Sequence, residues 1–356
     1  MPLSEKALIR RIRRQAKPSG SLVRTGIGDD AAVLACPAGF EVLLTTDFSL
    51  EGVHFRREWH PPDSVGYRCL TRGLSDIAAM GGEPTAAFLS LALPADLPQS
   101  WVNGFMRGLL RLARKYNVPL AGGDTAESPA GVLADIVVVG QVPAGKALLR
   151  SGARAGDSVY VTGELGLSAA TLYRLRQGGT TALGPKGKPR QGAYDPHFYP
   201  QPRIAVGRWL RERRLATAAI DVSDGLSTDL GHICEESSVG ALVYEAAIPR
   251  QSGLPTSSLH YALHGGEDYE LLFTAPKTRP IPSRIAGVRV TALERSSAAA
   301  RCGWWIATGS ANRSRRVAGN TSPMSDEFLY NGCDTKTNLQ STPTRPGKHF
   351  SYPCRL

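Results

Sequence analysis

The residues of this sequence best suited to chemistry are aspartates that stand in turns or close behind apolar runs. The set comprises Asp29, Asp30, Asp47, Asp76, Asp124, Asp221 and Asp224. Adjacent carboxylates such as Asp29 and Asp30 repel each other, so a fold keeps them in open water or next to a cation. Several oxygen ligands without neighbouring His or Cys are typical of a site for a hard cation, Mg²⁺ or Mn²⁺, with phosphates supplying further oxygens.

The apolar runs before these aspartates indicate where their carboxylates lie. Residues 41–46 and 218–222 read as strands, with Asp47 and Asp221 at or near their ends, and Asp124 follows a Gly-Gly pair. In α/β sheets, ligands bind beyond the carboxyl ends of strands, so we expect these turns to converge on one site. Each single aspartate could instead be a turn residue, and Asp224 could be a helix N-cap.

Asp76 is the most informative of these residues. It falls near the last turn of a helix that is expected to start at Asp63 or Ser64 and to end before Gly81. The helix dipole disfavours an anion there by roughly 0.3–1 kcal/mol. A bound cation would offset this cost, and so would Arg72, four residues earlier in the helix.

One segment has the glycine and lysine spacing of a nucleotide-binding loop without the other residues that such a loop needs. Residues 140–147 have the spacing of a P-loop, but Ala147 stands where Ser or Thr would hold Mg²⁺. Ser151-Gly152 also interrupts any helix that could face the phosphates, so we exclude a P-loop. Arg150 could grip phosphate oxygens bidentately, or it could be an ordinary surface arginine.

Hydrophobic periodicity predicts a mixed α/β chain with two domains and an irregular tail. Helices are expected near residues 4–17, 63–80, 100–116, 168–177, 203–214 and 226–233. Strands are expected near residues 41–46, 88–93, 118–121, 135–140, 158–162, 218–222, 241–244 and 269–274. A turn-rich piece at 151–157 separates a domain of residues 1–150 from one of residues 151–295. Residues 296–356 are rich in Ser, Arg, Asn, Thr and Pro, and their composition predicts little regular structure.

Composition narrows the class of protein. The net charge is +11, but nine Lys/Arg against three Asp/Glu from Arg295 onward account for more than half of it. No nucleic-acid reading motif appears, and no apolar run approaches the roughly 18–20 residues of a membrane span. The basic N-terminus lacks the apolar core of a signal peptide. Six cysteines without a CxxC pair favour the reducing cytoplasm and argue against structural zinc.

Taken in order, the motifs resemble the thiamine-monophosphate kinase family over about residues 1–290. They are Gly26-Ile27-Gly28-Asp29-Asp30, Thr45-Thr46-Asp47, Leu74-Ser75-Asp76-Ile77-Ala78-Ala79-Met80-Gly81, Gly122-Gly123-Asp124-Thr125, Arg150-Ser151-Gly152-Ala153, Asp221-Val222-Ser223-Asp224-Gly225 and Gly265-Gly266-Glu267-Asp268-Tyr269. The resemblance implies the two-domain fold of the aminoimidazole ribonucleotide synthetase-like superfamily. An N-terminal α/β domain would dimerise through its sheet, and a C-terminal α+β domain would follow.

The resemblance also implies an activity, direct phosphoryl transfer from ATP to thiamine monophosphate. It makes Asp30, Thr45, Thr46, Asp47, Asp76, Asp124, Asp221 and Asp224 the positions for several Mg²⁺ ions. Gly123, Asp124, Arg150 and Ser223 become ATP contacts, and His54 and Glu267 face the thiamine phosphate. No side-chain nucleophile is expected, because such chemistry depends on positioning and charge neutralisation.

The C-terminus departs from the family pattern. The expected Gly-aromatic-Asp-His-Phe signature is missing, and Gly347-Lys348-His349-Phe350 is its only echo. A shifted reading frame near residue 296 would explain the change in composition. Two other readings stay open: a sister synthetase of the superfamily, making selenophosphate or aminoimidazole ribonucleotide, and a nucleotide-binding protein without turnover. The first thirty-five residues hold no Cys, which disfavours selenophosphate synthesis.

Overall fold

The structure is a computed structural model that describes residues 5–15, 22–25, 33–177, 183–184, 188–189, 196–250, 258–297, 303–308 and 315–318. The chain separates into a unit of Met1–Ala318 and a unit of Gly319–Leu356, and all described residues belong to the first. The Asp29-Asp30 turn and the segment 347–350 lie outside the described residues.

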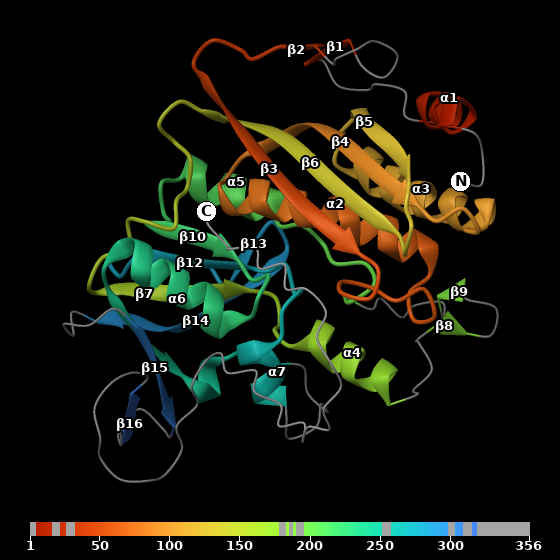
Figure 1. The fold of residues 1–356 in the computed structure, drawn as a ribbon. Helices are drawn as coiled ribbons and strands as arrows, with labels where there is room; N and C mark the ends of the chain where they lie inside the picture. The colour runs from red at the N-terminus through yellow and green to blue at the C-terminus, as the bar shows by residue number, and fades with distance from the viewer. Residues whose placement is uncertain are drawn as a thin grey trace, which may run out of the picture. The chain divides into compact units, whose positions relative to one another are not determined.

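The amino-terminal half is a four-stranded sheet with helices packed on one face (Figure 1). Its helices are α1 (Glu5–Gln15), α2 (Pro62–Ala79) and α3 (Gln99–Lys115), and its strands are β1 (Val23–Thr25), β2 (Val33–Leu34), β3 (Phe40–Leu50), β4 (Glu83–Leu93), β5 (Leu120–Glu127) and β6 (Leu133–Pro143). The sheet order is β3-β6-β4-β5, with β4 and β5 parallel and the other two pairs antiparallel. Helix α2 packs on β3 and β6, and α3 packs on α2.

Strand β3 is longer than the sequence predicts, and this changes the position of Asp47. The strand pairs with β6 along its whole length, so Asp47 lies inside it, opposite Ile136, and not beyond its end. Side chains alternate between the two faces of a strand. Asp47 and Thr45 therefore share the helix-covered face, whereas Thr46 lies on the outer face with Leu44.

Close backbone contact fixes α2, the helix that carries Asp76, against α3. A Cβ added at Gly66 would stand 2.0 Å from the carbonyl oxygen of Phe105, and one at Gly108 would stand 1.8 Å from that of Asp63. These glycines are required because any side chain would force the two helices apart. The start of α2 also differs from the prediction: Pro62 occupies its first turn, after Pro61, and neither Asp63 nor Ser64 caps it.

The second half is built on a larger, mostly antiparallel sheet. Its elements are β7 (Asp157–Thr162), α4 (Leu167–Arg176), β8 (Leu183–Gly184), β9 (Lys188–Pro189), α5 (Ile204–Glu212), β10 (Ala218–Asp221), α6 (Leu226–Ser237), β11 (Gly240–Tyr244), a 3-10 turn at Glu245–Ala247, α7 (Ser258–His264), β12 (Leu271–Pro276), β13 (Arg284–Ile285), β14 (Val288–Ser297), β15 (Gly303–Thr308) and β16 (Arg315–Ala318). The strand order is β10-β12-β7-β14-β11-β15-β16, with β13 paired to β14. Helix α2 packs against β10 and α5, so it contacts both halves.

Regular structure continues beyond residue 296, where the composition predicts little of it. Strand β15 pairs in parallel with β11, and Leu242 stands opposite Trp305. The run Trp304-Trp305-Ile306 consists of strong strand formers, which the polar residues around it conceal in a composition average. Within the described ranges, no helix is long and apolar enough to cross a membrane.

Candidate active site

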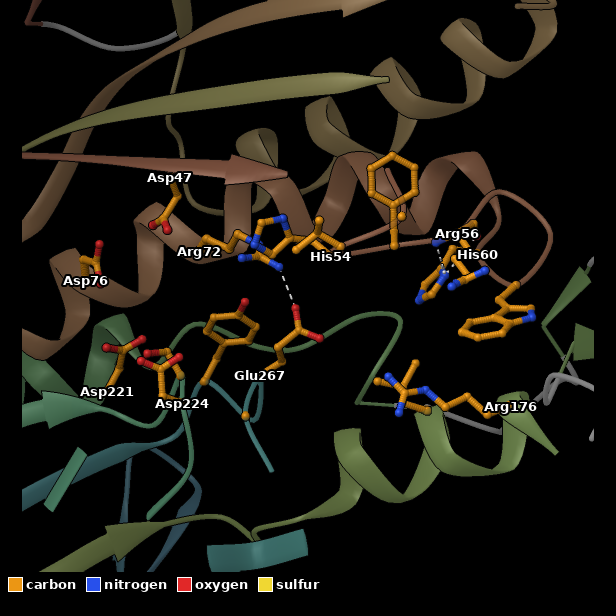
Figure 2. Close-up of a pocket in the computed structure, with 18 residues that line it drawn as sticks. Asp47, His54, Arg56, His60, Arg72, Asp76, Arg176, Asp221, Asp224 and Glu267 are labelled. Carbon is orange, nitrogen blue, oxygen red and sulfur yellow. Dashed lines mark hydrogen bonds and ion pairs between the residues drawn. The ribbon is translucent and has the colours of Figure 1, made fainter. Parts of the chain in front are cut away.

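A cavity of about 530 Å³ lies where α2 and β3 meet the second half of the chain. One end is lined by the carboxylates of Asp47, Asp76, Asp221 and Asp224. His54, Arg72 and Glu267 line the middle, and Arg56, His60 and Arg176 line the other end (Figure 2), where the Trp59 ring lies against Arg56. Seven of the site residues that the family resemblance implies therefore border one space: Asp47, His54, Asp76, Asp221, Ser223, Asp224 and Glu267.

The carboxylate end is assembled from separate elements. Asp47 comes from β3, Asp76 from the last turn of α2, and Asp221 is the final residue of β10. The Ser75 hydroxyl donates a hydrogen bond of 2.6 Å to Asp221 Oδ2, which joins α2 to β10. The Thr45 hydroxyl donates to Asp76 Oδ2. The Ser75 and Thr45 hydroxyls thus fix the positions of the Asp221 and Asp76 carboxylates.

The electrostatics of this cluster fit a divalent cation. Burial, followed by the charge of Asp76, raises the pKa of Asp47 to about 6. Burial and then Asp76 likewise raise the pKa of Asp221 to about 8, and burial raises that of Asp76. Mutual repulsion in a desolvated site therefore opposes full ionisation of the three. A hard cation would remove that repulsion, and all the donors are oxygens, as Mg²⁺ prefers.

Two arginines and one glutamate form an ion triad at the middle of the cavity. Nη2 of Arg68 and Nη2 of Arg72 each lie 2.5 Å from Glu267 Oε1. Burial alone would raise the pKa of Glu267, but the two guanidiniums outweigh it and the pKa lies below its usual value. Glu267 is therefore a carboxylate that stays ionised between two cations.

His54 presents a hydrogen-bond donor to this space. The backbone N–H of Leu50 donates to His54 Nδ1 at 3.0 Å. Burial, followed by the charge of Arg72, lowers the pKa of His54, so the ring is neutral near pH 7. With Nδ1 accepting, the proton of the neutral ring is assigned to Nε2. That nitrogen can donate to an anionic ligand.

The remaining predicted residues lie apart from the cavity lining. The Thr46 hydroxyl donates to Asp135 Oδ1 at 2.7 Å on the outer face of the sheet. Gly123 and Asp124 are on β5, three strands from β3, which corresponds to roughly 14 Å. Gly123 has a φ of +143° and approaches Leu89 so closely that a Cβ would stand 1.9 Å from its carbonyl oxygen. Arg150 acts on Asp76 through its charge.

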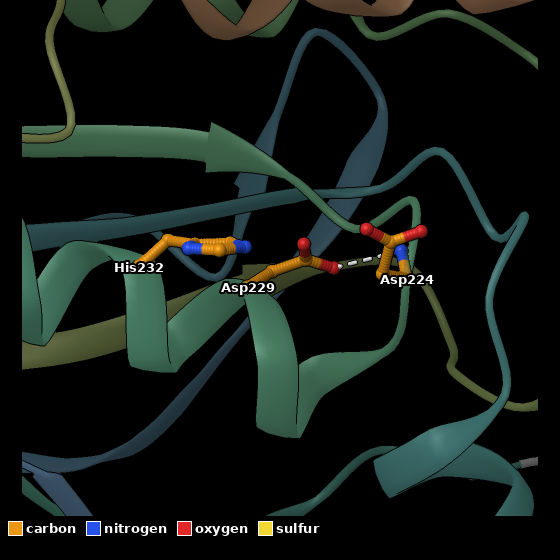
Figure 3. A group of neighbouring side chains, drawn as sticks. All are labelled: Asp224, Asp229 and His232. Carbon is orange, nitrogen blue, oxygen red and sulfur yellow. Dashed lines mark hydrogen bonds between the residues drawn. The ribbon is translucent and has the colours of Figure 1, made fainter. Parts of the chain in front are cut away.

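A second group of side chains supports the turn that carries Ser223 and Asp224 (Figure 3). Asp224, Asp229 and His232 have ligand atoms within 4.8 Å of one another. The Asp229 carboxylate accepts the backbone N–H of Asp224 at 3.1 Å, and burial raises its pKa to about 7. Asp229 therefore closes the turn from within α6 and keeps Asp224 directed toward the cavity.

The sequence gives little or no signal for several of these residues. Ser75 stands next to Asp76 in the same motif and could have been included with it. Arg68 and Asp229 could be identified only from the fold, because Glu267 lies far from Arg68 in the chain and Asp224 lies in the turn that precedes α6. The sequence suggests Arg72 only as a cation near Asp76, whereas in the structure Arg72 forms its ion pair with Glu267.

A buried histidine pair connects the cavity wall to α4. His60 and His197 are 2% and 1% exposed, and their Nε2 atoms lie 2.9 Å apart. His60 Nδ1 lies 3.0 Å from the Arg56 carbonyl oxygen, and His197 Nδ1 lies 2.9 Å from the Ser168 hydroxyl. Only one hydrogen fits between the two Nε2 atoms, so the rings cannot both be imidazolium cations, and two neutral rings satisfy the arrangement.

We expect this pair to make the folded state sensitive to acid. Burial and then the charge of Arg68 lower the pKa of His60 to about 4, and burial also lowers that of His197. The unfolded state takes up protons near the ordinary value of about 6.5, whereas the folded state does not. Stability from the pair is therefore complete above that pH and is lost as the pH falls toward 4, by about 3 kcal/mol for His60.

Unfolding by urea at pH 6.5 and pH 5 measures this effect when the protein is compared with His197→Gln. Buried carboxylates with raised pKa values, such as Asp268, act in the opposite direction, so the comparison between the two proteins isolates the pair. The decrease in unfolding free energy on acidification should be smaller in the variant by about 2 kcal/mol. Equal decreases in the two proteins would contradict the assignment.

Comparisons with known proteins agree on one family. The family AIR synthase related protein, N-terminal domain, matches residues 28–142, and AIR synthase related protein, C-terminal domain, matches residues 154–280. Thiamine-monophosphate kinase of Escherichia coli is 41% identical over 282 residues, which are 78% of this chain and 84% of the relative.

Solved structures give the same result. The crystal structure of thiamine-monophosphate kinase from Stenotrophomonas maltophilia K279a has a TM-score of 0.73 and 34% identity, and the match covers 85% of this chain and 97% of that one. AaThiL complexed with AMPPCP and TMP has a TM-score of 0.65 and 30% identity, covering 86% and 95%. The expected two-domain fold of the aminoimidazole ribonucleotide synthetase-like superfamily is thereby confirmed.

Proposed function

This chain belongs to the thiamine-monophosphate kinase family, and we propose that it phosphorylates thiamine monophosphate with ATP in the cavity described above. The product is thiamine diphosphate, and the chain is a phosphotransferase whose acceptor is a phosphate group. The observation that carries this proposal is the convergence of Asp47, Asp76, Asp221 and Asp224 at one end of the cavity. The structure of AaThiL with AMPPCP and TMP supports the pairing of a nucleotide with thiamine monophosphate.

Magnesium ions are the second part of the proposal, and the donor set supports them. Asp47, Asp76 and Asp221 would hold them, with Asp224 at the edge of the group, and Asp30 from outside the described residues. When bound, Mg²⁺ neutralises phosphate charge and aligns the phosphates for transfer. Arg150 and Ser223 are assigned to ATP. Ser223 supports this assignment by lining the cavity beside Asp224.

No protein group needs to act as a strong base in this reaction. The attacking oxygen belongs to the substrate's phosphate, which is already ionised at neutral pH. The chain therefore contributes positioning and charge. His54 donates through Nε2 from the middle of the cavity, and Ser75 and Thr45 keep Asp221 and Asp76 in place.

The direct test is to incubate the full chain with ATP, Mg²⁺ and thiamine monophosphate and to separate the products by chromatography. Equal amounts of ADP and thiamine diphosphate are expected, and chelation of the metal should stop their formation. Thiamine in place of its monophosphate serves as the control acceptor and should yield no diphosphate. Substrate-independent ADP release, or nucleotide binding without products, would instead favour a sister synthetase or a binding protein.

A homodimer formed through the amino-terminal sheet is the third part of the proposal. Val42, Leu44 and Phe48 are 55%, 70% and 54% exposed on the outer face of β3, an unusual position for three large apolar side chains. Thr46 lies among them, so in the dimer it lies at the interface. A second sheet of the same kind is the partner that would bury this face symmetrically.

Leu44→Lys is expected to convert the dimer into a monomer, because it places a charge in the centre of the proposed interface. Light scattering coupled to gel filtration measures the change in mass. Lys146→Glu, which changes an exposed charge after the end of β6, is the control and should stay dimeric. A wild-type protein that is monomeric at micromolar concentration would contradict the dimer.

Domain limits and location complete the proposal. The family matches end at residue 142 and resume at 154, which supports a boundary at 150–151 and a second domain of residues 151–295. Cys36 and Cys69 are free thiols. Free thiols are typical of a reducing compartment, and with ATP as co-substrate they support a cytoplasmic location.

A further inference from the structure

We propose that Arg72 binds the phosphate of thiamine monophosphate, and that Glu267 orients Arg72 and does not itself contact that phosphate. The inference rests on the proposed function, because it assigns a position to the acceptor. It also revises the role that family resemblance gives to Glu267. Three observations lead to it: the charge of the cavity, the surroundings of Arg72 and the partners of Glu267.

A cation on the cavity wall, in addition to the proposed Mg²⁺ ions, would favour binding of the acceptor. Thiamine monophosphate carries an anionic phosphate, and it must approach an end of the cavity where four carboxylates and the phosphates of ATP already share those ions. Arg68 and Arg72 bring two positive charges to the neighbouring wall, and Glu267 cancels one. One net positive charge remains there, which can attract one anionic group.

Arg72 is the member of the triad placed to use that charge. It lines the cavity between Asp47 and His54 (Figure 2), whereas Arg68 is only 3% exposed and is not among the lining residues. Its Nη2 donates to Glu267, but its buried Nε has no hydrogen-bond partner among the described residues. The guanidinium thus has donor capacity that Glu267 leaves unused. A planar guanidinium also matches the oxygens of a phosphate group.

Glu267 is held too firmly, and has the wrong charge, to bind a phosphate. Its backbone N–H donates to the carbonyl oxygen of Ser223 at 2.8 Å, and its φ of +68° is a costly conformation for a residue with a side chain. Its Oε1 atom contacts both guanidiniums. A carboxylate in direct contact with a phosphate would add repulsion. Orientation of Arg72 is a role consistent with all of these contacts.

The phosphate and the thiamine portion then occupy different parts of the cavity. Arg72 and His54 stand side by side in the middle (Figure 2), so a phosphate bound to Arg72 can also accept a hydrogen bond from His54 Nε2. The thiamine portion would extend from there toward Trp59 and Arg176, away from the carboxylates. The acceptor phosphate then lies between its own ring system and the ATP phosphates.

Calorimetric titration with thiamine monophosphate and with thiamine, both without ATP, isolates the contribution of the phosphate. Arg72→Ala should weaken thiamine monophosphate binding by about 10- to 100-fold and change thiamine binding by less than about twofold. Arg72→Lys keeps the charge without the planar fork and should recover part of the loss. Arg176→Ala, at the other end of the cavity, is the matched control and should not selectively weaken binding of the phosphorylated ligand.

Glu267→Gln separates the two roles of the glutamate. If Glu267 only orients Arg72, the variant should lose far less affinity for thiamine monophosphate than Arg72→Ala does, because positive charge is retained. Equal losses of affinity for thiamine monophosphate and thiamine in Arg72→Ala would overturn the proposal. So would a loss of thiamine monophosphate affinity in Glu267→Gln that exceeds the loss in Arg72→Ala. Because binding is measured without turnover, a wild-type chain that binds the monophosphate but makes no diphosphate contradicts the proposed function alone. A wild-type chain that binds both ligands equally contradicts this inference.

Discussion

Asp47→Asn is expected to weaken Mg²⁺-dependent ATP binding severely and so to reduce turnover by about 10²- to 10³-fold, while the protein unfolds at a higher temperature without divalent cations. The first effect follows because Asp47 supplies a charged oxygen at the carboxylate end of the cavity. The higher unfolding temperature follows because Asp47 is desolvated and lies next to Asp76, and both factors raise its pKa. A neutral amide removes that repulsion and still fits the strand.

Thermal unfolding with and without Mg²⁺, together with ATP titration, checks both effects. Wild-type protein should gain stability when Mg²⁺ and ATP are added, and Asp47→Asn should gain little. Asp96→Asn removes an exposed carboxylate in a turn that does not line the cavity, so it should behave as wild type. Unchanged nucleotide affinity in Asp47→Asn would count against the metal assignment. A large fall in the melting temperature of the metal-free variant would count against repulsion between Asp47 and Asp76.

Asp47→Asn is thus predicted to lower activity and to raise thermal stability, a combination typical of residues kept for function at a cost in stability. Asp47, Asp76 and Asp221 come from three elements and two halves of the chain, and nothing in their local sequences requires them to meet. The Ser75–Asp221 hydrogen bond and the packing of α2 on β10 hold them together. A ligand with positive charge is the simplest reason for a fold to keep that arrangement.

The aspartates and their neighbouring apolar runs could be read from the sequence, but their convergence has a different cause from the one expected. The expected rule places ligands beyond the carboxyl ends of parallel strands. In the structure, Asp47 lies inside an antiparallel strand. It reaches the cavity because its side chain is on the face of β3 that α2 covers, as is that of Thr45. Strand length and pairing depend on β6, about ninety residues later, so local sequence could not fix them.

Pairs that are distant in sequence were the least predictable part of the site. Arg72 and Glu267 are 195 residues apart, and His60 and His197 are 137 apart. Each residue alone is an ordinary polar side chain with many compatible partners. Packing of α2 between the two halves brings them together, and that packing depends on buried surface contributed by both. Helical periodicity identified α2 and α3 correctly but could not supply their partners.

Glu270→Ala is expected to lower the free energy of unfolding by about 3–5 kcal/mol, because it removes one partner of a buried ion pair. Glu270 is 5% exposed and accepts hydrogen bonds from Arg203 Nε at 2.7 Å and from the Thr162 hydroxyl at 2.5 Å. Arg203 Nη2 also donates to its other carboxylate oxygen. The substitution leaves a partly buried guanidinium and a buried hydroxyl without this acceptor.

Urea unfolding monitored by tryptophan fluorescence measures the loss, and Glu58→Ala is the matched control. Glu58 pairs with Arg56 at 3.6 Å and both side chains are exposed, so its removal should cost less than about 0.5 kcal/mol. Because Arg203 precedes α5 and Glu270 precedes β12, the pair also fixes the loop that presents Glu267. Glu270→Ala should therefore also weaken thiamine monophosphate binding. A destabilisation below about 1 kcal/mol would mean that the guanidinium finds another partner or water at little cost.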